Sequence, residues 1–153
     1  MKYIDEKFAD IQILRYKLVG FEELSLRQKI YIYYLSKAVL SGRDITFDQF
    51  GKYNLRIRKV LECIYLNYDG NRGNQDFREL VIYLKRVWFS NGIYHHYNCD
   101  KFTPKFSKSF FCEAYDALPY ELLGLSSDDA KQELRAELLK VIFDEDYLPK
   151  RVN

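Results

Sequence analysis

The chain has 153 residues, of which 30% are charged and 17% aromatic, and its formal net charge is only +2. Because positive and negative charges nearly balance, the composition argues against a nucleic-acid binder, which needs a strongly basic surface. No apolar run approaches the roughly 20 residues that a membrane-spanning helix requires, so we expect no membrane partner.

The N-terminal part is predicted to be an arm followed by a helix. Residues 1–24 show no clean period, and we expect an extended or short helical arm that docks on the rest of the protein. Ser25 and Gln28 have the spacing of a capping box, in which each side chain binds a backbone N–H of the first turn. The helix is predicted to run to about Leu40, with Gly42 as its stop. Its predicted buried stripe consists of Leu26, Ile30, Tyr31, Tyr34, Leu35 and Ala38.

Residues 43–53 are predicted to form a solvated loop, because the spacing of Asp44 and Asp48 matches no calcium loop. Asn54 is predicted to cap a second helix that ends near Tyr68. One face of this helix is apolar, with Ile57, Leu61, Ile64, Tyr65 and Tyr68. The other face is basic, with Arg56, Arg58 and Lys59. A solvated helix face is the simpler interpretation, and a single-stranded nucleic-acid site is a weaker alternative.

Three further helices follow. Residues 76–91 have the strongest helical period, with Phe77, Leu80, Val81, Leu84, Val87 and Trp88 at the predicted core face. Ser107 caps a short helix to about residue 117, with Phe110, Phe111, Ala114 and Tyr115 facing inward. A last helix spans 126–143, with Leu134, Leu138, Val141 and Ile142. We therefore predict a mostly α fold without strands: about five helices in an irregular bundle, forming one domain over residues 1–153.

The segment 89–104 is the predicted functional loop, and it contains both His residues and one of the 3 Cys. Glycine at a helix end lets backbone approach a partner closely, and Tyr and Asn offer polar groups beside apolar surface. One interpretation is a peptide-binding wall; the other is a packed Ω-type loop of core aromatics. The candidate substrate-binding residues are Asn91, Gly92, Tyr94, His96 and Tyr97.

No catalytic residue, metal or cofactor is predicted in this chain. His95, His96 and Cys99 invite a zinc interpretation, but they lie within five residues, and adjacent side chains tend to point apart. Cys99 beside His96 lacks any nucleophile signature. The odd number of Cys favours free thiols, and no signal peptide is visible, so we expect a cytoplasmic protein.

Two blocks, residues 26–38 and 83–104, resemble the dipeptidyl peptidase III family of zinc-dependent exopeptidases, which remove dipeptides from peptide N-termini. The second block carries the order Val-aromatic, Ser-Asn, Gly, Tyr, aromatic, Lys-Phe-x-Pro. Residues 8–16, 20–24, 42–45 and 149–153 are similar to the bacterial branch, so the resemblance covers nearly the whole chain.

The resemblance implies that this chain is the N-terminal part of a longer, two-lobed peptidase. The family's zinc is held by a His-Glu-x-x-x-His helix and a later Glu in another lobe, and no His-Glu pair occurs here. The implied partners are therefore a peptide substrate and the missing catalytic lobe. Tyr97 matches an aromatic position of the family's cleft. The tail 144–153 carries no stop signal, as expected of a fragment. The alternative is a stand-alone helical interaction module that uses the 88–104 loop.

Overall fold

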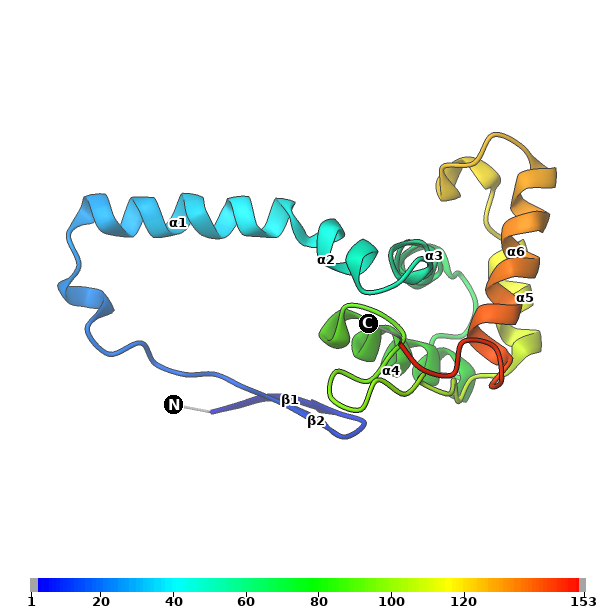
Figure 1. Ribbon diagram of the computed structural model, residues 1–153, viewed down its shortest axis with the longest axis horizontal. Coiled ribbons are helices and arrows are strands. Elements are labelled where there is room, and N and C mark those ends of the chain that lie inside the picture. Colours follow the sequence, from blue (N-terminus) through cyan, green and yellow to red (C-terminus); the bar gives the residue numbers. More distant parts are fainter. Residues whose placement is uncertain (1–2, 152–153) are drawn as a thin grey trace. The chain divides into compact units, whose positions relative to one another are not determined.

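The computed structural model describes residues 3–151, and its helices and strands are labelled in Figure 1. Most residues are helical, which confirms the predicted fold class. The chain divides into two compact units, Met1–Thr46 and Phe47–Asn153, and each is described by itself. Of the segment 149–153 that carries part of the family resemblance, the last two residues lie outside the described range.

The first unit opens with a β-hairpin, so the prediction that the chain has no strand was wrong. Strand β1 (Ile4–Phe8) pairs antiparallel with β2 (Ile11–Leu14), and the turn contains Ala9 with a left-handed φ of 47°. Of the residues in the two strands, only Ile11 is buried. Without a buried face there is no reason for apolar residues to alternate, and the turn lacks the usual Gly or Asn signal.

A 3-10 helix, η1 (Phe21–Glu23), leads into helix α1 (Leu26–Ser41). The capping box is confirmed, because Ser25 Oγ accepts from Gln28 N while Gln28 Oε1 accepts from Ser25 N. The predicted buried stripe was wrong, since α1 has no buried residue. Its large apolar side chains lie all round the helix rather than on one stripe; those exposed include Ile30, Tyr31, Ile32, Tyr33, Tyr34, Leu35, Val39 and Leu40.

The predicted loop after α1 is a helix for most of its length. Gly42 does end α1, but its φ of −86° is not left-handed, and α2 (Arg43–Gln49) begins at the next residue. Phe47 of α2 is completely buried. The acidic side chains that suggested a solvated turn are compatible with a short helix, because Asp44 lies in its first turn, where the helix dipole favours negative charge.

The second unit contains the four remaining predicted helices. They are α3 (Asn54–Asn67), α4 (Gln75–Ser90), α5 (Lys108–Asp116) and α6 (Asp128–Phe143), with a 3-10 helix η2 (Tyr120–Leu123) between α5 and α6. The expected cap at Ser107 is present, with its Oγ accepting from Phe110 N at 3.2 Å. In α6, Ser127 Oγ accepts from Ala130 N at 3.2 Å. Asn74 caps α4 through Phe77 N.

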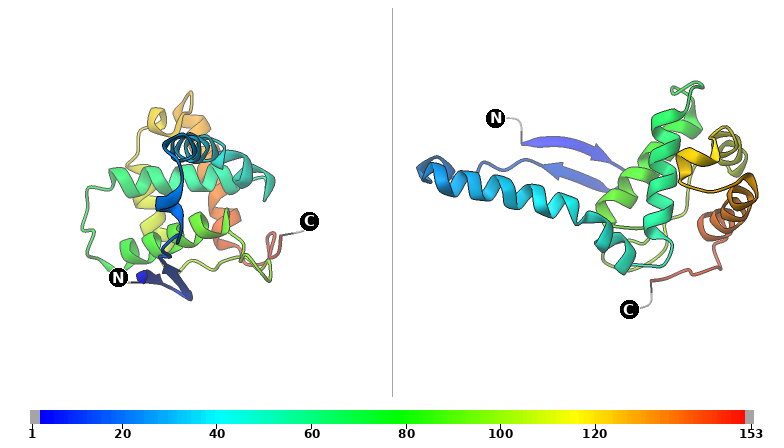
Figure 2. Two further views of the ribbon diagram at one scale, coloured as in Figure 1. Left: turned by 90° about the vertical axis from the view of Figure 1, so that its left-hand side faces the viewer. Right: turned by 90° about the horizontal axis from the view of Figure 1, so that it is seen from above.

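The core of the second unit is built from the faces that the periodicity predicts. Helix α3 packs on α4, and α5 packs on both α3 and α6 (Figures 1 and 2). Phe111 and Tyr115 of α5 are completely buried. The Tyr115 hydroxyl donates to the Lys131 carbonyl at 2.9 Å, and burial raises the pKa of this tyrosine to about 12.

The three cysteines, which all lie in the described part of the chain, form no disulfide. Cys63, Cys99 and Cys112 are half-buried free thiols, and burial raises the pKa of Cys63. Among the residues that the structure describes, no helix is both long enough and apolar enough to cross a membrane.

Candidate functional site

The predicted functional loop starts at a sharp helix end. Helix α4 stops at Ser90, and Asn91 takes a left-handed φ of 54°. The Gly92 N–H then returns to the Val87 carbonyl at 3.0 Å, which satisfies one of the last carbonyls of the helix. The predicted stop at 91–92 is thus confirmed, and it turns the chain toward α3.

The side chain of Asn54 ties this turn to α3. It is 1% exposed, and its Oδ1 accepts from Ile93 N at 3.1 Å. A Cβ on Gly92 would lie 2.3 Å from Asn54 Nδ2, and a Cβ on Gly51 would lie 2.9 Å from the same atom. Both glycines are therefore needed for the close approach. The prediction that Asn54 caps α3 was wrong: the cap position is Tyr53, which makes no side-chain cap bond.

Beyond Ile93 the loop closes on itself as a short hairpin. His95 N donates to the Asp100 carbonyl at 2.8 Å, and Phe102 N donates to the Ile93 carbonyl at 2.8 Å. Cys99, at a left-handed φ of 62°, makes the turn. The loop is therefore a hydrogen-bonded structure with its own register, rather than an irregular connection.

The C-terminal segment ties the loop down from its other edge. Lys101 N donates to the Pro149 carbonyl at 2.9 Å, and Arg151 N donates to the Cys99 carbonyl at 2.9 Å. The Tyr94 hydroxyl reaches the Leu148 carbonyl at 3.2 Å. The C-terminal segment, about fifty residues further along the chain, thus pairs with the hairpin and extends it.

Lys101 joins the loop to the end of α6. Its Nζ donates to the carbonyls of Val141 at 3.2 Å, Asp144 at 2.5 Å and Tyr147 at 2.5 Å. A cation at the C-terminal end of a helix satisfies carbonyls that have no partner within the helix and opposes the negative end of the dipole. Lys101 therefore fixes the loop to the helical core.

The tip of the loop is an aromatic stack. The rings of His95 and His96 lie 4.5 Å apart with 25° between their planes, and the Tyr97 ring lies 4.3 Å from His96. His95 Nδ1 accepts from the backbone N–H groups of Tyr97 and Asn98 at 3.2 and 3.4 Å. Tyr97 itself remains 85% exposed. The tip thus holds a tyrosine in place without burying it.

These residues do not fit a zinc ion. The two imidazoles stack face to face, and His95 Nδ1 is used by backbone amides. Cys99 Sγ accepts a hydrogen bond from Arg151 Nη2 at 3.6 Å. Within residues 3–151 no group of three or more His, Cys, Asp or Glu side chains is arranged to hold a metal.

The five predicted substrate-binding residues occupy three places: an exposed stack, a pocket and the turn at the end of α4. His96 and Tyr97 belong to the exposed stack, whereas Tyr94 lines a pocket of about 520 Å³ next to the loop. Asn91 and Gly92 form the turn that connects α4 to both. The sequence analysis missed the other walls of this pocket, which come from the α2–α3 connection and the C-terminal segment: Phe50, Tyr53, Tyr147, Leu148 and Arg151.

Two tyrosine hydroxyls meet in this pocket. Tyr53 and Tyr147 place their oxygens 3.4 Å apart, although they are 94 positions apart in the chain. This hydrogen bond, together with Lys52, lowers the pKa of Tyr53. The same hydrogen bond, together with burial, raises the pKa of Tyr147. Burial raises the pKa of Tyr94. The pocket wall is therefore aromatic but hydrogen-bonded, with cations close by.

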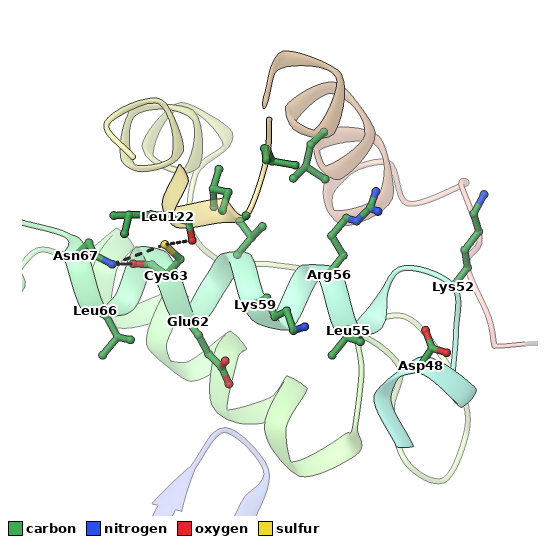
Figure 3. Close-up of a pocket in the computed structure, with 15 residues that line it drawn as sticks. Asp48, Lys52, Leu55, Arg56, Lys59, Glu62, Cys63, Leu66, Asn67 and Leu122 are labelled. Carbon is green, nitrogen blue, oxygen red and sulfur yellow. Dashed lines mark hydrogen bonds between the residues drawn. The ribbon is translucent and has the colours of Figure 1, made fainter. Parts of the chain in front are cut away.

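A second, larger hollow of about 810 Å³ runs along α3, beside η2 and α6 (Figure 3). Cys63 Sγ contacts the Leu122 carbonyl at 3.7 Å on its floor, and Leu66 and Leu122 are exposed along it. At one end Arg56 pairs with Glu137 at 3.3 Å.

The basic face predicted on α3 is not continuous. Arg58 is only 8% exposed, with its guanidinium 4.7 Å from the centre of the Phe47 ring and its Nε 3.4 Å from Glu62. The expectation of a fully solvated face was wrong at this position, because the aliphatic stem and planar head of Arg can pack against an aromatic ring. With Arg56 also paired, α3 offers no uninterrupted cationic stripe.

A comparison with models of known protein families finds no match, and a comparison with curated protein sequences finds none either.

Proposed function

We propose that this chain is the N-terminal scaffold and cleft-wall segment of a dipeptidyl peptidase III-like zinc peptidase, an enzyme that releases dipeptides from peptide N-termini. The observation that carries the proposal is the anchored loop. It is held by Asn54 and by Lys101, while Tyr97 at its tip stays exposed. Such an arrangement suits a binding wall, because a wall that is already ordered loses little entropy when substrate binds.

In this proposal the metal chemistry belongs to another lobe. A zinc ion bound there would polarise the scissile carbonyl and activate water. The residues of this chain would position the peptide: Tyr97 would offer a ring and a hydroxyl to it, and the hairpin 93–102 would keep that ring in place. The chain alone is therefore expected to hydrolyse no dipeptidyl substrate. Its half-buried free thiols support a reducing, cytoplasmic compartment.

The test is made on the longer protein. If the reading frame continues into a His-Glu-x-x-x-His helix, the long protein is purified with Tyr97→Ala and, as a matched control, with Tyr16→Ala, whose ring is also exposed. Loss of a substrate contact should raise KM for a dipeptidyl arylamide several-fold, while the control stays at the wild-type value. Equal kinetics for all three proteins would refute the role of Tyr97, and a reading frame without the zinc motif would refute the proposal.

The second candidate is a stand-alone helical interaction module. It is favoured by the apolar side chains that α1 exposes all round, because a helix of that kind is normally buried against partners. The hollow along α3, with Leu66 and Leu122 exposed, is a second surface of this type (Figure 3). Two measurements distinguish the two candidates: the reading frame after residue 153 and sedimentation of the 153-residue chain. A stop codon after residue 153, together with sedimentation as a complex of defined size, favours the module.

A further inference from the structure

The pocket beside the loop has an unusual charge for this protein. Among the described residues, its wall carries three cations, Lys52, Lys150 and Arg151, and no Asp or Glu. The whole chain, by contrast, has 24 basic and 22 acidic residues. Nearby Asp100 is paired with Lys150 at 3.2 Å on the exposed edge. Lys52 and Arg151 therefore leave the wall with an excess of positive charge.

Arg151 is held in place without a carboxylate. Its backbone N–H is bound to the Cys99 carbonyl, and its guanidinium lies 4.6 Å from the centre of the Phe50 ring. Within residues 3–151 its side chain donates to the Cys99 sulfur, a weak acceptor, and its buried Nε has no hydrogen-bond partner. A guanidinium fixed by stacking is preorganised to bind a carboxylate through two parallel hydrogen bonds.

The tyrosine pair adds a donor. Two hydroxyls that share one hydrogen bond use one hydrogen between them, so the other hydrogen is left for an outside acceptor. Either hydroxyl can be the donor within the pair, so the remaining hydrogen belongs to Tyr53 or to Tyr147. Tyr94 already donates to the Leu148 carbonyl, so the Tyr53–Tyr147 pair supplies the hydroxyl that can donate to an outside acceptor.

We propose that this pocket binds a carboxylate carried on an apolar or aromatic residue. Arg151 and Lys52 hold the charge, the Tyr53–Tyr147 pair donates a hydrogen bond, and Phe50 and Tyr94 contact the apolar part. A volume of about 520 Å³ lies within the usual range of roughly 300–1,000 Å³ for small-ligand sites. This last assignment rests on the proposed function: the ligand is the free C-terminal carboxylate of a short peptide.

The experiment is a calorimetric titration of the 153-residue chain with matched probes. N-acetyl-phenylalanine and its amide differ only in the carboxylate, and a tetrapeptide ending in Phe is used with a free and with an amidated C-terminus. The acids should bind about ten-fold or more tightly than the amides, since one charge-assisted contact has that effect. Equal binding of acid and amide would overturn the proposal. If the tetrapeptide acid binds more weakly than N-acetyl-phenylalanine, the site serves a free small acid and the peptide assignment is wrong.

The variants locate the site. Arg151→Gln should weaken binding of the acids about ten-fold and leave binding of the amides unchanged, whereas Arg27→Gln, on the exposed face of α1, should change neither. Tyr53→Phe should cause a smaller loss. If Arg151→Gln unfolds, Lys52→Gln replaces it, because Lys52 is exposed and its loss cannot disturb the core. Wild-type binding in either charge variant would overturn the proposal. Failure of the peptidase reading frame leaves these titrations unaffected, so the two proposals fail separately.

Discussion

Replacing Lys101 with Met tests whether the loop is held to the core in the way the geometry indicates. The substitution keeps the length and apolar stem of the side chain but removes the three hydrogen bonds to the carbonyls of Val141, Asp144 and Tyr147. A hydrogen bond from a charged donor contributes about 1.5–3 kcal/mol. The three bonds share one ammonium group and are not additive, so the sum is an upper limit.

Two effects reduce the expected loss. Burial lowers the pKa of Lys101, which shows that its charge is partly desolvated in the folded protein, although Asp144, Glu145 and Asp146 oppose this shift. Of the carbonyls that are left without a donor, that of Asp144 belongs to an exposed residue, where water can replace the ammonium group, whereas Val141 is buried. We expect Lys101→Met to lower the free energy of unfolding by about 2 kcal/mol, and the melting midpoint by roughly 4–8 °C.

The assay is urea unfolding followed by Trp88 fluorescence. Trp88 is the only Trp of the chain, and it lies in the second unit, where its Nε1 donates to Glu62 Oε1 at 2.7 Å. The signal therefore reports the unit that contains Lys101. Lys105→Met is the matched control, because Lys105 is an exposed lysine of the same segment, and it should cost less than about 0.5 kcal/mol. If both variants unfold at the same urea concentration, the three carbonyl contacts do not stabilise the loop.

Two further predictions concern packing and pH. Gly92→Ala should destabilise the second unit by about 3 kcal/mol, because the added Cβ meets buried Asn54. Gly124→Ala should cost about 1 kcal/mol, because it only places an alanine at a positive φ of 69° in open space. Equal losses of stability in urea unfolding would exclude the clash. Burial raises the pKa of Tyr115 to about 12, so the folded state keeps a proton that the unfolded state loses near pH 10. Stability should therefore fall as the pH rises from about 10 to about 12, and Tyr115→Phe should make this fall shallower; an unchanged slope in pH-dependent unfolding would contradict the assignment.

Periodicity predicted the helices of the second unit and their buried faces because one side of each helix lies against a single core. In the first unit the sequence predicted helix α1 and its capping box, but the predicted buried stripe and the absence of strands were wrong, for a physical reason. The hairpin buries only Ile11 of its strand residues, so its sequence carries no alternation. Helix α1 has apolar side chains all round, and any stripe drawn on it is arbitrary; Leu35 and Tyr34 are both exposed.

The candidate site was predicted only in the part that is contiguous in sequence. Asn91, Gly92 and Tyr94 stand out because Gly, Asn and Tyr cluster there. Tyr53 and Tyr147 could not be paired from sequence, since 94 positions separate them and neither carries a motif. An Asn at a helix start usually indicates a cap. Gly51 lies three residues before Asn54, and that Gly-x-x-Asn spacing was the signal for a close backbone approach.

We propose that this chain is a scaffold beside a metal site held elsewhere. The most direct measurement compares zinc content and dipeptide release for the 153-residue chain and for the longer product of the same reading frame. We predict no stoichiometric zinc and no dipeptide release for the chain, and one zinc with zinc-dependent dipeptide release for the longer protein. Zinc-dependent release by the 153-residue chain alone, or none by the longer protein, would contradict the account.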